Sequence, residues 1–165
     1  MSAERVVVAY AGVHQAYQHA LAAYEIGELA RFYCALYQDP SKAGARHARY
    51  VGAGLMDGRR AEGLDLGRVV EVPWPLLAKV AGDRLYPRGA GDWLAANKAF
   101  DFWVSRRLAA DPPELFIGTA SSDLHSLQVL KRRGSYLMHD CPGLHPTLEH
   151  QLLTEAAELA GVRAT

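Results

Sequence analysis

The chain has 165 residues, and its 18 basic side chains are balanced by 18 acidic ones, with an isoelectric point of about 7.1. This length suits one α/β domain, and the even charge argues against a dedicated nucleic-acid-binding protein. The two cysteines, Cys34 and Cys141, exclude a disulfide-rich secreted scaffold and offer no zinc spacing. No stretch approaches the roughly 20 apolar residues of a membrane span. We therefore expect a soluble protein in a reduced, cytoplasmic setting, and peripheral contact with a membrane surface stays open.

The first third of the chain alternates between strand and helix patterns. Residues 6–10 form a short, continuously apolar run, which is typical of a strand buried on both faces. Apolar side chains recur at helical spacing over residues 17–24, and Gly27 follows where a helix would end. A second apolar run at residues 29–37 completes a strand–helix–strand unit, whose crossover we expect to be right-handed.

Residues 38–67 break this alternation. They are rich in glycine and sustain no period, so they predict a long irregular insertion with room for one short helix. A solvated loop is the commoner role for such a charged segment, and contact with an anionic acceptor or a membrane headgroup is the alternative. The basic side chains concerned are Lys42, Arg46, His47, Arg49, Arg59 and Arg60.

The rest of the chain returns to the alternating pattern. Strand patterns lie at residues 68–72, 114–118 and 135–139, and helix patterns lie at 76–85, at about 92–110, from the 119–123 turn to Arg133, and from Pro146 to Gly161. Four aromatic side chains are expected to serve core and helix packing rather than to stack on sugars: Trp74, Trp93, Phe100 and Trp103. The alternation predicts an α/β fold with a Rossmann-like parallel sheet and helices on both faces, as a single domain over residues 1–165.

Polar side chains gather in three turns that follow predicted strands, at residues 11–15, 119–125 and 139–145. The carboxyl ends of parallel strands share one edge of a sheet, where α/β proteins bind ligands at a switch in strand order. Four of the chain's seven histidines fall in these turns, namely His14, His125, His139 and His145. The three turns therefore predict one site.

The first turn contains a single glycine, Gly12. The dinucleotide fingerprint G-x-G-x-x-G is absent, because Gln15 and Ala16 occupy the later positions, and this argues against an NAD-dependent enzyme. One glycine still lets the backbone approach a ligand, and the helix N-terminus beyond it could receive a phosphate. A tight strand-to-helix turn with no ligand is an equal alternative.

The other two turns allow a chemical and a structural interpretation. His139 follows an apolar strand directly and could bind a sugar hydroxyl or move a proton, although the residues alone favour a structural histidine bonded to the adjoining turn through Asp140. Residues 121–123 are interpreted as a helix N-cap, because a catalytic serine would need a G-x-S-x-G elbow. Cys34 is expected to be buried and inert, and Cys141 shows no sign of activation.

Three segments of the chain are similar to a known family. Residues 7–15 (VVAYAGVHQ) with the helix after them, residues 100–101 (FD), and residues 134–140 (GSYLMHD) with His145 and the 149–161 helix resemble bacterial glycosyltransferases of the GT-B fold, family four. The resemblance spans nearly the whole chain as a diffuse pattern. It implies the N-terminal, acceptor-side member of the two Rossmann-like domains of such an enzyme.

The resemblance also implies roles for individual residues. The turn at Gly12, Val13 and His14 would lie near the donor diphosphate, although many relatives have two adjacent glycines where this chain has one. His139 would lie by the transferred sugar as the catalytic residue. The other substrate-binding residues would be Thr119, Ser121 and Asp123, near the acceptor hydroxyls, together with Asp140 and His145.

The implied reaction moves a sugar from a nucleoside diphosphate sugar to an acceptor hydroxyl with retention, and it needs no cofactor and no metal. The C-terminal domain that would hold the donor is not among these residues, so we expect it in cis or in trans, and we expect the chain alone to be inactive. Sugar, polysaccharide and lipid acceptors stay open, as does contact with the inner face of the membrane. A non-catalytic Rossmann- or flavodoxin-like ligand-binding module is the alternative function.

Overall fold

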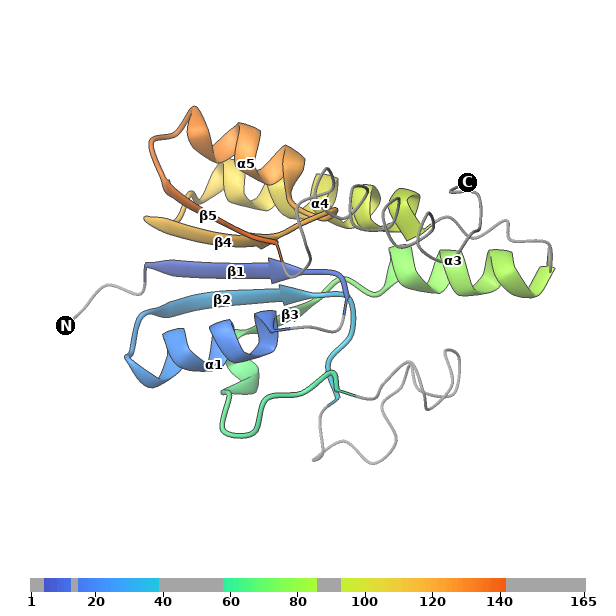
Figure 1. Cartoon of the computed structure of the whole chain (residues 1–165), viewed down its shortest axis with the longest axis horizontal. Coiled ribbons are helices and arrows are strands. Elements are labelled where there is room, and N and C mark those ends of the chain that lie inside the picture. Colours follow the sequence, from blue (N-terminus) through green and yellow to red (C-terminus); the bar gives the residue numbers. More distant parts are fainter. Residues whose placement is uncertain (1–4, 13–14, 39–57, 86–92, 142–165) are drawn as a thin grey trace, which may run out of the picture.

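The computed structural model describes residues 5–12, 15–38, 58–85 and 93–141 (Figure 1). Its described part contains a five-stranded, all-parallel sheet in the order β3-β2-β1-β4-β5. The strands are β1 (Val6–Tyr10), β2 (Leu29–Cys34), β3 (Val69–Glu71), β4 (Leu115–Thr119) and β5 (Tyr136–Asp140). All five predicted strands are present, and the prediction of a Rossmann-like α/β fold is confirmed.

Helices cover both faces of the sheet. They are α1 (Ala16–Glu25), α3 (Trp74–Leu85), α4 (Trp93–Ala110) and α5 (Leu124–Lys131), with a 3-10 turn, η2 (Leu66–Arg68), before β3. Figure 1 shows α1 on one face and α4 and α5 on the other. The connection from β1 to β2 runs in one direction across the sheet, and the connection from β4 to β5 runs in the opposite direction. Because such connections are right-handed, α1 and α5 lie on opposite faces. No helix in the described ranges is both long and apolar enough to cross a membrane.

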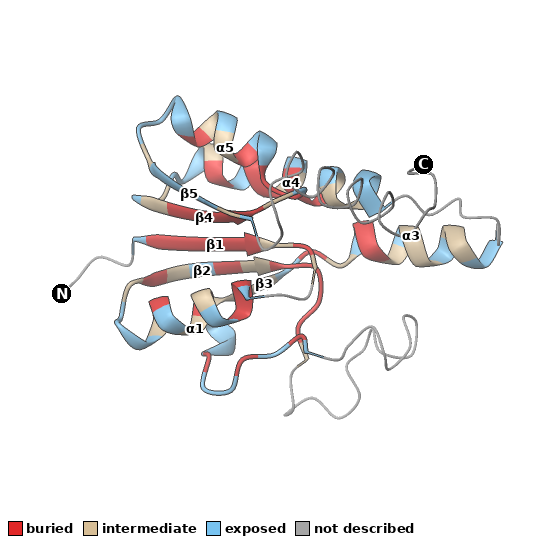
Figure 2. Ribbon diagram, viewed as in Figure 1, coloured by how far each residue is buried: buried red, intermediate tan, exposed pale blue. Residues whose placement is uncertain are grey.

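The core consists of one apolar layer on each face of the sheet. On the α1 face, the rings of Tyr17 and Phe32 meet edge to face with centroids 5.0 Å apart, and Val8 packs in the same layer. On the other face, Phe100 of α4 packs in one layer with Phe116 of β4. Figure 2 shows β1 buried along most of its length, as its uninterrupted apolar sequence predicts.

The predicted ends of two helices are confirmed by positive backbone angles. Gly27 follows α1 with φ +75°, and Gly134 follows α5 with φ +82°, a region that glycine enters without steric cost. The start of α3 differs slightly from the prediction, because this helix begins at Trp74 and includes Pro75. Proline is tolerated there, since the first turn of a helix has no partner for its N–H.

The aromatic side chains divide between core and surface. Phe100 is fully buried and Trp103 packs against the core, as expected. Trp74 and Trp93 are instead about half exposed, so neither belongs to the core, although Lys79 of α3 lies over the Trp93 ring, 4.3 Å from its centroid. Both lie at the first residue of a helix.

β5 forms the edge of the described sheet and is its least covered strand. Tyr136 is 72% exposed and Met138 is 47% exposed, although both are apolar strand residues. The predicted site residues Val13, His14 and His145 lie outside the described residues. The same holds for the predicted final helix and for residues 39–57 of the insertion.

Candidate functional site

The carboxyl ends of β1, β4 and β5 lie side by side. Gly118 pairs in register with Ala9 of β1 and with His139 of β5, and the N–H of Ala120 donates to the carbonyl of Asp140 over 2.9 Å. The strand order changes direction between β1 and β4, so this edge is the switch point at which open α/β sheets bind ligands. The described residues predicted for the site all lie at this edge: Gly12, Thr119, Ser121, Asp123, His139 and Asp140.

A carboxylate and an imidazole face each other at this edge. Oδ2 of Asp123, at the start of α5, lies 2.5 Å from Nδ1 of His139, at the end of β5. The Asp123 side chain is 3% exposed, whereas the His139 side chain is 42% exposed. With Nδ1 held by the carboxylate, Nε2 is the ring nitrogen that a ligand could bind. The sequence favours Asp140 as the partner of a structural His139. The structure shows Asp123 as the partner instead.

Burial controls the electrostatics of this pair. It raises the pKa of Asp123 above its ordinary value, and the nearby carboxylate of Asp101 raises it further, while the hydrogen bond with His139 lowers it in part. A buried carboxylate that bonds a single imidazole fixes the ring in one orientation and selects its tautomer. The pair is therefore suited to bind a hydroxyl group or to carry a proton.

Gly118 makes room for the pair. A Cβ atom at this position would lie 2.6 Å from both Cβ and Oδ2 of Asp123, and 2.8 Å from the ring of Phe116. Such distances are far below van der Waals contact, so a larger residue would displace the Asp123 carboxylate. Position 118 therefore requires glycine, because the Asp123 side chain packs directly against its backbone.

The N-cap prediction for residues 121–123 is confirmed in position and wrong in the bond. Asp123 occupies the N-cap position of α5 but makes no capping hydrogen bond with its side chain. Asp101, buried on α4, accepts instead from the N–H groups of His125 (2.6 Å) and Ser126 (3.0 Å), and from the Ser126 hydroxyl (2.6 Å). Because a residue from another helix caps α5, the Asp123 carboxylate is left to bind His139.

The two serines of the same turn are bonded within the protein. Ser121 has a positive φ of 74°, which is uncommon for a residue with a side chain, and its hydroxyl accepts from the amide of Asn97 over 3.0 Å. The hydroxyl of Ser122 donates to the carbonyl of Thr119 over 3.2 Å. These contacts hold the shape of the turn that presents Asp123.

Arg59 is buried, whereas the sequence predicts a solvated basic loop. Its side chain is 2% exposed, and Nη1 donates to the carbonyl groups of Ala11 (3.2 Å) and Gly12 (3.3 Å). A loop residue 47 positions away thus anchors the turn after β1. Tyr10 closes over the same turn, because a Cβ on Gly12 would lie 2.7 Å from its ring. The contact with Tyr10 explains why position 12 is a glycine. A role for Gly12 in binding a phosphate stays a prediction.

Three other side chains that the sequence singles out, His125, Cys34 and Cys141, are not members of the carboxylate–imidazole pair. The exposed ring of His125 packs edge to face against Phe102, with centroids 6.1 Å apart. Cys34 is completely buried, as predicted, and burial raises the pKa of its thiol. Cys141 is a free, exposed thiol.

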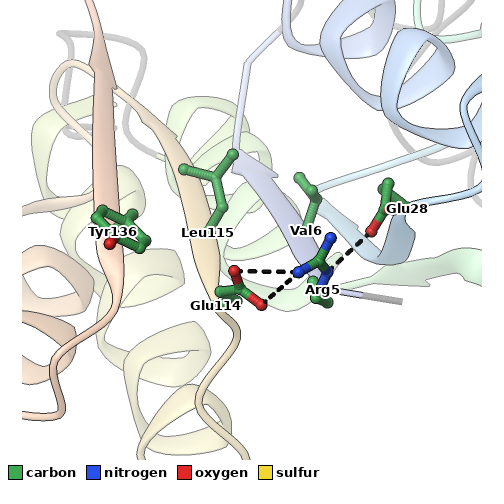
Figure 3. Close-up of a pocket in the computed structure, with 6 residues that line it drawn as sticks. All are labelled: Arg5, Val6, Glu28, Glu114, Leu115 and Tyr136. Carbon is green, nitrogen blue, oxygen red and sulfur yellow. Dashed lines mark hydrogen bonds and ion pairs between the residues drawn. The ribbon is translucent and has the colours of Figure 1, made fainter. Parts of the chain in front are cut away.

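A shallow cavity of about 350 Å³ lies at the opposite, amino edge of the sheet (Figure 3). Its polar centre is Arg5, which bonds Glu28 over 3.2 Å and Glu114 over 3.0 Å. These contacts join the start of β1 to the loops before β2 and β4. We interpret this cavity as structural, because parallel sheets bind ligands at the carboxyl edge.

The described ranges contain no group of three or more histidine, cysteine, aspartate or glutamate side chains that could hold a metal ion. Comparison of the chain with protein-family models, with curated proteins and with solved structures gives no match. The candidate site is therefore defined by its own geometry.

Proposed function

We propose that this chain is the acceptor-side, Rossmann-like half of a nucleotide-sugar-dependent glycosyltransferase of the GT-B kind. The observation that carries the proposal is the Asp123–His139 pair, with Oδ2 and Nδ1 2.5 Å apart at the switch point of the sheet. The likeness of residues 7–15 and 134–140 to such enzymes supports it. A buried carboxylate holding an exposed imidazole at a strand end suits the recognition of a sugar hydroxyl.

In the proposed reaction, the bond between the sugar and the diphosphate breaks, and its electron pair leaves with the diphosphate. The sugar forms a new bond to an acceptor hydroxyl, whose proton passes to the leaving diphosphate. His139 would hydrogen-bond the transferred sugar through Nε2, and Asp123 would act as its positioning residue. Charge stabilisation of the leaving diphosphate is the main catalytic task in such a reaction, and groups on a second domain would supply most of it.

The test is sugar transfer by the chain together with a second Rossmann-like domain, if its reading frame or a neighbouring one encodes such a domain. Radiolabelled nucleoside diphosphate sugars serve as donors. We expect His139→Ala to lower turnover about 100-fold, within the range for a lost acid–base or hydroxyl-binding group. His125→Ala is the matched control, because it removes an exposed histidine from the start of α5.

Equal turnover by wild type and His139→Ala would contradict the assignment of His139. If sugars bind at the carboxyl edge but no donor sugar is ever transferred, the chain is a non-catalytic ligand-binding module.

A further inference from the structure

A second group of polar atoms lies at the same carboxyl edge, on the opposite face of the sheet from the Asp123–His139 pair. Side chains alternate along a strand, so Asp140 projects to the other face from His139. Its register partner on β4 is Thr119, which follows Gly118 and therefore projects to the same face as Asp140. His19 belongs to α1, the helix that covers this face.

Three buried atoms of this group have no hydrogen-bond partner among the described residues. They are Oγ1 of Thr119, Oδ2 of Asp140 and Nδ1 of His19. The last two lie 3.8 Å apart, which is too long for a hydrogen bond. Buried polar atoms are nearly always paired in folded proteins, and each unpaired one is costly. Three on neighbouring elements mark a place where a polar ligand would satisfy them together.

The chemistry of the three atoms favours a hydroxyl group. A carboxylate oxygen only accepts, whereas a threonine hydroxyl and an imidazole nitrogen can each donate or accept. A ligand hydroxyl could donate to Asp140 and accept from His19 or Thr119. Because Nδ1 of His19 and Oδ2 of Asp140 are 3.8 Å apart, one ligand oxygen can lie about 2.8 Å from both atoms. The three atoms themselves are buried, but the side chains of His19 and Asp140 are partly exposed, so the group lies just beneath the surface.

We propose that His19, Thr119 and Asp140 form a subsite for one hydroxyl group of the acceptor carbohydrate. This inference rests on the proposed function and adds to it His19 and the three unpaired atoms that would hold the acceptor hydroxyl. Donor-side and acceptor-side contacts then lie on opposite faces of one strand end, with His139 and Asp140 adjacent in sequence.

The first experiment is a titration of the 165-residue chain, labelled on its threonine methyl groups, with a panel of methyl glycosides of glucose, mannose, galactose and N-acetylglucosamine. We expect a saturable shift of the Thr119 methyl signal with at least one sugar. Thr119→Val keeps the shape of the side chain and should weaken that binding about fivefold, measured by isothermal titration calorimetry because the variant lacks the labelled methyl group. Asp140→Asn should weaken it at least tenfold, because it removes a charged acceptor.

Thermal unfolding separates a ligand subsite from an internal hydrogen bond. Thr119→Val should leave the melting temperature unchanged or raised, because it removes a buried hydroxyl without a partner. Unchanged sugar binding by Thr119→Val would overturn the subsite. So would a lowered melting temperature with unchanged binding, which would show that the hydroxyl serves a buried water. Binding of no sugar in the panel would also overturn it.

Kinetics of transfer distinguish the failure of this subsite from the failure of the proposed function. Thr119→Val should raise the KM for the acceptor about fivefold and leave the KM for the donor unchanged. If His139→Ala abolishes transfer while Thr119→Val leaves both KM values unchanged, the function stands and the subsite is wrong. If the wild type binds an acceptor sugar through Thr119 but transfers none, the subsite stands and the transferase function is wrong.

Discussion

Asp123 is held as a buried carboxylate beside a second one, Asp101, and this arrangement costs stability at neutral pH. Burial raises its folded pKa above the ordinary value that it has in the unfolded chain. The folded chain therefore holds this proton more tightly than the unfolded chain does. The contribution of Asp123 to the free energy of unfolding therefore falls as the pH rises from about 4 through its raised folded pKa, and then stays level.

Asp123→Asn should remove this pH dependence and the negative charge that holds the His139 ring. We expect the unfolding free energy of the variant, relative to wild type, to increase as the pH rises from about 4 toward 7, while sugar transfer falls. Urea unfolding at several pH values measures the difference. A difference that stays constant or shrinks with pH would show that burial does not raise the pKa of Asp123. A gain in stability with a loss of activity is the usual trade-off at a functional site.

Gly118 should tolerate no side chain. Gly118→Ala would place a methyl group 2.6 Å from the Asp123 carboxylate, so we expect a loss of about 1–3 kcal/mol in unfolding free energy and a loss of activity. Gly82→Ala is the matched control, since it lies in α3 with open space around its Cβ. It should gain about 0.5–1 kcal/mol from helix propensity. Equal effects of the two changes in chemical denaturation would contradict the crowding at Gly118.

At the scale of elements, the N-terminus of α5 is fixed by α4. Asp101 accepts three hydrogen bonds from residues 125 and 126, and this places the preceding turn with Asp123 at the end of β5. The contact joins residues 24 and 25 positions apart. The geometry of the site therefore depends on the packing of two helices as much as on the strands that end there.

Asp101→Ala should lower the free energy of unfolding by about 2–3 kcal/mol, because it leaves buried donors without an acceptor. Asp83→Ala is the control, since its partly exposed ion pair with Lys79 contributes less than about 1 kcal/mol. Urea denaturation measures both. A smaller loss for Asp101→Ala than for Asp83→Ala would mean that α5 does not depend on this cap.

At the scale of the whole molecule, the two edges of the sheet have different roles. The amino edge is joined by the exposed ion pairs of Arg5, and the carboxyl edge carries the buried carboxylates and unpaired polar atoms. Exposed ion pairs are screened by water and salt, so they tie loops together without creating a reactive group. We therefore expect the ligand-binding groups at the carboxyl edge, where the carboxylates are buried.

Arg5→Gln should leave sugar binding unchanged, because it lies at the edge opposite the site. We expect a slightly lower melting temperature at low salt, and a smaller difference at high salt. The methyl-labelled titration described above provides the comparison with Asp140→Asn. If Arg5→Gln weakens sugar binding as strongly as Asp140→Asn, the ligand binds at the amino edge and the candidate site is misplaced.

The amino-acid sequence by itself determined the elements and the edge of the sheet where polar residues gather. The elements follow from local patterns: continuous apolar runs, helical spacing, and the glycines at 27 and 134. Because these patterns act between neighbouring residues, the sequence alone predicts them. The gathering of Gly12, Thr119 and His139 followed because parallel strands end together.

Only the tertiary structure decided which polar groups become partners. Asp101 caps a helix 24 residues away, Arg59 is buried under a turn 47 residues away, and His19 lies beside Asp140. No local pattern specifies these pairs, because they depend on which faces of helices and loops meet once the sheet has formed. The partner of His139 was therefore Asp123, across a turn and a helix, and not its sequence neighbour.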